Sequence, residues 1–323
     1  MAPGSGLAEE VIAPDEEAVT AQFIAFMKAA TVKRAGTGIR RRFNQARETA
    51  CVEAEFIVPD GLRAEHRVGL FSTPRTYAAS IRFANAASSS DRERDLRGMS
   101  VRVLGVDQTN VTPGATVHDF VLNSHPVMMA GDTRGFMELL QANEAGGLRR
   151  AMYFLTHPKA LRIAGAARTN PTCHLDIPYW SATPYLFGAG RAVKYIVAPT
   201  SARRSSLPAV LTDAYLKDAM RARLSTSEAT FDFMIQFQTD PKRMPIEDAS
   251  VEWAPHDSPY VPVARIRIPS QSLDDPLRAA RCEQEGFNPW HCLPEHRPLG
   301  GMNRARRSIY DAMAAFRNEI VRT

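Results

Sequence analysis

An arginine and a tyrosine near the end of the chain have a spacing that would bring their side chains together on a helix. Arg306 and Tyr310 are four residues apart, so a helix would place both on one face. A phenol with a pKa of about 10 must lose its proton to bind a metal, and an adjacent guanidinium favours the charged form. The pair is therefore a candidate phenolate ligand. The alternative is that Tyr310 is a core residue beside a surface arginine and that neither side chain takes part in a reaction.

Two further arginine positions could hold an anion. Arg82 lies inside the otherwise apolar stretch of residues 80–84, where a charge needs either water or a buried partner of opposite sign. The run Arg40, Arg41 and Arg42 precedes a predicted strand. Guanidinium groups bind carboxylates and phosphates through two parallel hydrogen bonds, so this run is either a solvated edge or an anion site.

Other motifs argue against common cofactors. The Gly-Ala-Gly of residues 188–190 lacks the third glycine of a dinucleotide-binding loop, which indicates a turn. His291, Cys292 and His296 could suggest zinc, but their spacing matches no common ligand pair and Pro294 interrupts it, so we expect a packed loop. The chain has no Gly-x-Ser-x-Gly motif and no P-loop, which weakens a hydrolase or NTPase interpretation.

The elements that must position these residues are strands flanked by helices. Strand patterns cover residues 51–58, 78–83, 99–106, 117–122, 192–197, 231–238 and 261–268, and helical patterns cover residues 14–33, 133–169 and 302–317. Most of the strands follow one another too closely for helical crossovers between parallel strands. We therefore predict an α+β fold, an antiparallel sheet or barrel with helices packed outside it.

The composition is that of a soluble globular protein. The 323 residues contain 40 basic and 35 acidic side chains, a net charge of +5, and the basic residues form no long block, so nucleic acid is not an expected partner. No apolar stretch is long enough for a transmembrane helix, and the acidic N-terminus lacks the apolar core of a secretory signal. Four widely spaced cysteines without a CxxC pair predict free thiols in a reducing compartment, and hence a cytoplasmic protein.

Five motifs in the same order resemble those of catalases. They are Arg42-Phe-Asn-Gln45 with the strand that follows it, Ile81-Arg82-Phe83-Ala84, Asp95-Leu-Arg97-Gly98, the stretch from His118 to Pro126, and Arg306-Arg-Ser-Ile-Tyr310. A further segment, residues 287–300, resembles the compact catalase-related haem proteins of bacteria. The resemblance covers residues 38–317.

The resemblance implies an eight-stranded antiparallel β-barrel with flanking helices that binds haem b. Tyr310 would be the axial ligand of the haem iron, as tyrosine is in catalase, with Arg306 beside it. Arg42 and Arg82 match the arginines that pair with the haem propionates. Phe154 loosely matches the phenylalanine that stacks on the haem.

The resemblance also divides the chain. We expect an N-terminal arm and helix in residues 1–36 and a catalase-like haem-binding domain in residues 37–323, without the extra domains of full-length catalases. A small-molecule substrate is the expected partner, and a homo-oligomer is an open alternative to a monomer.

The distal side departs from the catalase pattern. Gln45 stands where catalases carry the distal histidine, and shifting the alignment by one residue offers Asn44 or an alanine, never a histidine. Ser124 stands where the distal asparagine belongs. Ala84 replaces the serine that hydrogen-bonds to the histidine, which is consistent because there is no imidazole to orient.

These departures change the chemistry that we expect. Hydrogen peroxide cleavage needs a group that moves a proton from one oxygen to the other, which imidazole does near neutral pH. The side chains of Gln45, Asn44 and Ser124 form hydrogen bonds but do not titrate in that range. We therefore expect a haem-dependent enzyme that acts on an organic hydroperoxide or another oxidised small molecule, with weak true catalase activity.

Two alternatives remain open. One is a peroxide-scavenging catalase or peroxidase in which another base replaces the histidine, and His125 is the nearest in sequence. The other is a non-catalytic protein that binds haem to sense or store it or a small gas.

Overall fold

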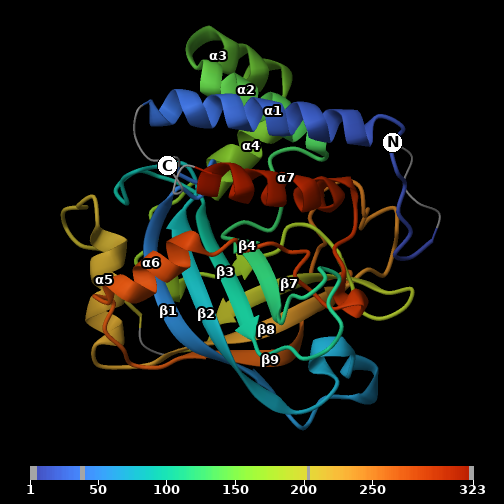
Figure 1. Cartoon of the computed structure of the whole chain (residues 1–323), viewed down its shortest axis with the longest axis vertical. Coiled ribbons are helices and arrows are strands. Elements are labelled where there is room, and N and C mark those ends of the chain that lie inside the picture. Colours follow the sequence, from blue (N-terminus) through green and yellow to red (C-terminus); the bar gives the residue numbers. More distant parts are fainter. Residues whose placement is uncertain (1–5, 37–40, 202–203, 320–323) are drawn as a thin grey trace.

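A computed structural model describes residues 6–36, 41–201 and 204–319. Its centre is a closed antiparallel barrel, because the short strand β5 pairs with both β4 and β7 and so completes a ring of eight strands, β5-β4-β3-β2-β1-β9-β8-β7 (Figure 1). A ninth strand, β6, pairs with β7 alone within the sheet. The bounds are β1 Arg47–Val58, β2 Arg75–Asn85, β3 Arg97–Leu104, β4 Val117–Asn123, β5 Tyr179–Trp180, β6 Tyr185–Leu186, β7 Ala192–Pro199, β8 Ala229–Phe237 and β9 Val261–Ile268. The predicted α+β barrel is confirmed.

Alternation along each strand divides the barrel into a core and an outer face. In β4, Phe120 and Leu122 join the main hydrophobic core, where the Phe120 ring lies 4.6 Å from that of Phe233. Val121, between them in sequence, packs on the outer face with Phe287 and Tyr310. Side chains at odd positions of β4 therefore face the helices outside the barrel.

Seven helices surround the barrel in the part of the chain that the structure describes. They are α1 Glu16–Ala35, α2 Thr133–Ala145, α3 Gly147–Thr156, α4 Pro158–Ala167, α5 Tyr215–Leu224, α6 Pro276–Gln284 and α7 Gly301–Asn318. The helical pattern of residues 133–169 forms three helices, because Gly146 and Gly147 adopt positive φ and Pro158 starts a new helix. The short helices α5 and α6 are not predicted from sequence. Each has only nine or ten residues, and α6 buries only Arg278 and Cys282.

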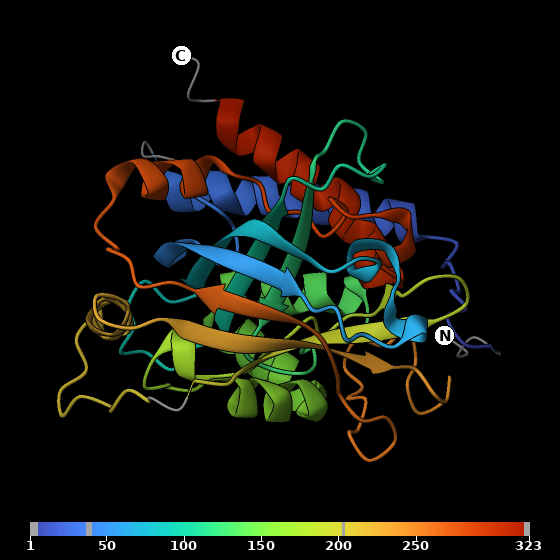
Figure 2. The same cartoon turned by 90° about the horizontal axis from the view of Figure 1, so that it is seen from below.

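The helices α6 and α7 lie on the same side of the barrel (Figure 2), and α1 packs against α7. Phe23, Met27 and Ala30 of α1 form one hydrophobic cluster with Ala305 and Ile309 of α7. The N-terminal helix therefore packs directly on the helix that carries Arg306 and Tyr310.

Arg304 ties the N-terminal arm to α7. Its guanidinium group donates hydrogen bonds to Glu10 at 2.6 Å, to Glu16 at 2.7 and 2.8 Å and to Glu247 at 3.2 Å. Despite desolvation by burial, these carboxylates raise the pKa of Arg304 further above its usual range. The start of α7 is therefore held by three separate segments of the chain.

The cysteines depart from the sequence-based prediction. Cys51 of β1 and Cys282 of α6 form a disulfide, whereas Cys173 and Cys292 are free and buried. The expectation of four free thiols is wrong for this pair because the fold joins residues 231 positions apart, a proximity that no local spacing reveals. The predicted cytoplasmic location loses that support. Among the described residues, no helix is long and apolar enough to cross a membrane.

We predict that the disulfide stabilises the fold measurably. Replacing both Cys51 and Cys282 by Ala should lower the free energy of unfolding by about 2–4 kcal/mol, because the cross-link restricts the unfolded chain. Denaturant titration with and without reductant measures this. Reductant should destabilise the natural chain and leave the double variant unchanged; equal stability of the two proteins without reductant would contradict the prediction.

Candidate functional site

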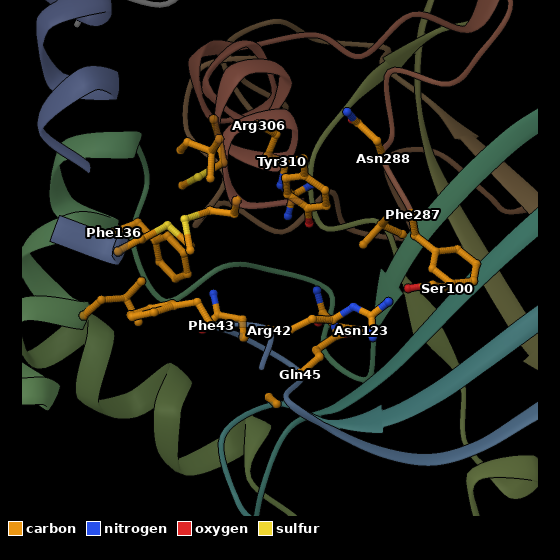
Figure 3. A pocket seen from close by; sticks show the side chains of 18 of the residues that line it. Arg42, Phe43, Gln45, Ser100, Asn123, Phe136, Phe287, Asn288, Arg306 and Tyr310 are labelled. Atoms are coloured by element: carbon orange, nitrogen blue, oxygen red, sulfur yellow. The ribbon is translucent and has the colours of Figure 1, made fainter. Parts of the chain in front are cut away.

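A cavity of about 680 Å³ lies between the outer face of β3 and β4 and the helix α7. Apolar side chains of α1, α2 and α7 form much of its lining, among them Phe23, Met27, Phe136, Leu140, Ile309 and Met313. The volume is typical of sites for small molecules and cofactors. Figure 3 shows side chains from several elements converging on this space.

Helix α7 supplies Arg306 and Tyr310, and both line the cavity as the four-residue spacing predicts. The hydroxyl group of Tyr310 points into the cavity (Figure 3). Arg306 is anchored by hydrogen bonds from its Nη1 to Thr183 Oγ1 at 3.2 Å and to Asn303 Oδ1 at 3.1 Å. These neutral acceptors leave the guanidinium charge without a carboxylate partner among the described residues.

Arg82 also lines the cavity and is 2% exposed. Its Nη2 donates a hydrogen bond to the Gln45 carbonyl at 2.9 Å, but its buried Nε has no hydrogen-bond partner among the described residues. The nearest carboxylates, Glu48 and Glu283, each lie 3.7 Å from the guanidinium group. Desolvation and the charge of Arg42 lower the pKa of Arg82 to about 10.

Arg42 and Arg317 lie close to Arg82 and line the same cavity. Arg42 donates hydrogen bonds to Glu283 Oε2 at 2.6 Å and to the carbonyl oxygens of Cys282 and Glu285. Burial and the charge of Arg42 lower the pKa of Arg317 as well. We call Arg42, Arg82 and Arg317 the arginine cluster. Sequence reasoning missed Arg317, although it lies seven residues after Tyr310 on the same helix; Arg40 of the basic run lies outside the described residues.

The wall opposite Tyr310 carries side-chain amides. Asn44, Gln45 and Asn123, which we call the amide wall, all line the cavity, and none of them titrates. Figure 3 places Gln45 and Asn123 across the cavity from Tyr310.

Local geometry fixes the position of Gln45. Its backbone has φ of +54°, an uncommon conformation for a residue with a side chain, and its N–H donates to the Ala86 carbonyl at 2.8 Å. A Cβ atom on Gly98 would lie 2.4 Å from the Gln45 Nε2. The glycine of the Asp-Leu-Arg-Gly motif therefore makes room for this amide.

Two predicted site residues do not line the cavity. Ser124 follows β4, where its Oγ accepts a hydrogen bond from the Arg97 N–H at 2.9 Å, and its neighbour Asn123 faces the cavity instead. Phe154 lies on α3 with its ring edge-on to Tyr153. The aromatic side chain that α2 contributes to the cavity is Phe136.

The structure also brings a histidine to the cavity that sequence reasoning assigned to a packed loop. His291 lines the cavity, and its Nδ1 lies 2.8 Å from Asp119 Oδ2. Arg102 donates two hydrogen bonds to the same carboxylate, at 2.8 and 2.7 Å. Because the carboxylate accepts at Nδ1, a neutral His291 keeps Nε2 as a proton acceptor.

The rest of that loop is packed as predicted. His296 is fully buried, with its Nε2 3.1 Å from the Leu70 N–H, and burial lowers its pKa to about 4. The described residues include no group of three or more His, Cys, Asp or Glu side chains that could hold a metal ion.

Comparison with known proteins identifies the architecture. No protein-family model matches the chain, and no curated protein matches it in sequence. Among solved structures, 124 chains match. A fungal catalase has a TM-score of 0.68 and 15% identity over 86% of this chain, and a bacterial catalase has 0.69 and 15% over 90%. Catalase A from Saccharomyces cerevisiae has a TM-score of 0.68 and 18% identity over 90% of this chain.

These similarities concern the fold. The chain spans 59%, 59% and 63% of the lengths of the three catalases, in the same order. At such low identity the comparison carries no substrate or cofactor from them to this chain. The barrel, its closure and the helices around it are those of the catalase fold.

Proposed function

We propose that the cavity binds haem b, with Tyr310 as the axial ligand, and that the protein is an enzyme acting on an organic hydroperoxide or another oxidised small molecule. The observation that carries the proposal is the content of one cavity. It has a tyrosine hydroxyl on one wall, side-chain amides that do not titrate on the opposite wall, and an arginine cluster in which the buried Nε of Arg82 has no hydrogen-bond partner among the described residues.

The residues present fit a ligand that carries carboxylates. In the part of the chain that the structure describes, the three guanidinium groups of the arginine cluster share two carboxylates, Glu48 and Glu283, and burial raises the pKa of Glu48, which weakens its charge. The partnerless Nε of Arg82 is a buried donor, which is costly unless a ligand accepts its hydrogen bond. The two propionates of haem b would supply such acceptors.

Tyr310 and Arg306 would serve the iron. Tyr310 would hold the iron through its phenol oxygen, and Arg306, one turn earlier on α7, would place a positive charge on the same side of the cavity. Phe136 would pack against the macrocycle in place of Phe154, because α2 lines the cavity and Phe154 does not. When bound, haem supplies the redox-active iron that can cleave an O–O or N–O bond.

The amide wall decides which substrate suits the site. Asn44, Gln45 and Asn123 can hold an oxygen- or nitrogen-rich group by donating and accepting hydrogen bonds, but they cannot move a proton between two oxygens. We propose Asn123 for the polar role predicted for Ser124, since Ser124 binds the Arg97 backbone. Such a wall suits a substrate that only has to be positioned. It suits hydrogen peroxide less well, because cleavage of hydrogen peroxide needs proton transfer.

A peroxide-scavenging activity is the second candidate, and His291 favours it. The imidazole lines the cavity and is oriented by Asp119, as a general base should be. His125, the base suggested by sequence, is not among the cavity-lining residues. The third candidate is a haem-binding protein without turnover. It makes the same cofactor predictions as the other two and differs from them only in having no activity with any hydroperoxide.

Tyr310→Phe should abolish or greatly weaken haem retention and change the ferric absorption spectrum, because the variant lacks the ligand oxygen. Haem content per protein and the visible spectrum after reconstitution measure this. Tyr260→Phe, a tyrosine outside this cavity, is the matched control and should retain haem. Full haem occupancy with an unchanged spectrum in Tyr310→Phe would refute the ligand assignment.

Arg82→Met should lower haem affinity by ~10- to 100-fold while keeping the ferric spectrum, since a hydrogen bond to a charged group contributes about 1.5–3 kcal/mol. Haem titration of the apoprotein measures the affinity. Arg265→Met on β9, whose side chain is 61% exposed, removes one positive charge elsewhere and should have no effect. Equal loss in both variants would show that only net charge matters.

Gln45→His should raise oxygen release from hydrogen peroxide, because general acid–base catalysis typically contributes ~10²–10⁴-fold. Asn143→His places an imidazole elsewhere in the cavity lining and should give no such gain. The measurement is initial oxygen release per bound haem. If the natural chain already reaches catalase-like rates and Gln45→Ala keeps them while His291→Ala loses them, the peroxide-scavenging candidate is correct.

A further inference from the structure

The helices α3 and α4 form a hairpin with apolar side chains exposed to solvent. Leu148, Met152 and Leu155 lie at the i, i+4 and i+7 positions of one face of α3 and are 79%, 50% and 75% exposed. Leu161 on α4 is 53% exposed. No residue of α3 is buried, and in Figure 1 this helix lies on the far side of α1 and α7 from the barrel.

The hairpin and its flanking residues also carry positive charge without any acidic side chain. Residues 145–175 contain five arginine and lysine side chains and no aspartate or glutamate, a local charge of +5. The whole chain has the same net charge, so the remaining residues balance to zero. Arg149, Arg150 and Arg162 are exposed, and none forms an ion pair with a described residue.

Exposed apolar side chains flanked by unpaired positive charges are typical of helices that lie in a membrane surface. The apolar face enters the boundary between headgroups and acyl chains, while lysine and arginine contact anionic lipid headgroups. We propose that the α3–α4 hairpin docks on a lipid surface that carries anionic headgroups. This is peripheral docking, and it needs no helix that spans the bilayer.

Charge argues against a second copy of the chain as the occupant. In a symmetric dimer the same surface patch of each subunit faces the other, so two hairpins, each with a charge of +4 in residues 147–167, would be brought together without an acidic residue from either. A lipid leaflet with anionic headgroups supplies the opposite charge and an apolar layer at once.

The hairpin is continuous with the cavity. Ala167 ends α4 and, with Arg168, lines the cavity. The neighbouring helix α2 contributes Leu139, Leu140 and Asn143 to the same lining. Docking through α3 would therefore hold the cavity close to the lipid surface, where amphiphilic molecules are concentrated. The docking itself does not depend on haem or on the proposed reaction.

Co-sedimentation with vesicles tests the proposal on the full chain. Vesicles of phosphatidylcholine mixed with phosphatidylserine should bind the protein, and vesicles of phosphatidylcholine alone should bind it weakly. Leu148→Gln combined with Leu155→Gln should abolish binding. Arg149→Gln combined with Arg150→Gln should reduce binding to the anionic vesicles by about fivefold for each charge, with little effect on neutral ones.

Matched controls change the same residue types elsewhere. Leu277→Gln on α6, a leucine that is 82% exposed, and Arg63→Gln, an exposed arginine, should bind like the natural chain. Absence of binding to anionic vesicles, or binding that neither hairpin variant reduces, would overturn the proposal. So would a dimer in gel filtration that the leucine variant converts to a monomer, because self-association would then cover this face. Circular dichroism checks that the variants are folded, and loss of haem alone leaves the vesicle result unchanged.

Discussion

The hydrogen-bonded group around Arg304 holds together the side of the molecule on which the cavity depends. One guanidinium joins Glu10 of the N-terminal arm, Glu16 of α1 and Glu247 of the segment after β8. Removing one partner of a buried charge group leaves the others uncompensated, so such a group is sensitive to any loss. Arg304 lies in the first turn of α7, so these hydrogen bonds anchor the end of the helix next to Arg306 and Tyr310.

The opposite wall of the cavity is set by the barrel. The outward side chains of β3 and β4 and the turn that carries Gln45 are fixed by strand pairing, such as Ala84 with Gly98 and Gly98 with Asn123. The space between a barrel face and a separately anchored helix can therefore stay open without loss of the core, which lies inside the barrel. This division lets cavity-lining side chains such as Gln45 vary while the architecture persists.

The sequence predicts those parts of this arrangement that depend on residues close together along the chain. Alternation in residues 231–238 and the spacing of Arg306 and Tyr310 are both borne out. The misses come from contacts between distant residues: Cys51 with Cys282, and Asp119 with His291, 172 positions apart. Phe154 fails for another reason: no residue of α3 lines the cavity, and a loose match in sequence does not fix where that helix packs. The choice between Ser124 and Asn123 depends on a single step of strand register, which reverses the side that a residue faces.

Glu283 gives the arginine cluster an occupant of its own. Its carboxylate accepts a hydrogen bond from Arg42 at 2.6 Å and lies 3.7 Å from Arg82. An incoming carboxylate at these arginines must therefore exchange with Glu283 as well as fill the unused Nε of Arg82. The affinity for a ligand at such a site is therefore the difference between the binding free energies of two anions, the ligand carboxylate and Glu283, at the same hydrogen-bond donors. The cluster selects ligands by competition with Glu283 as well as by attraction. A ligand with a single carboxylate merely replaces the contacts that Glu283 already makes. A ligand with two carboxylates forms additional hydrogen bonds, because it can contact both arginines.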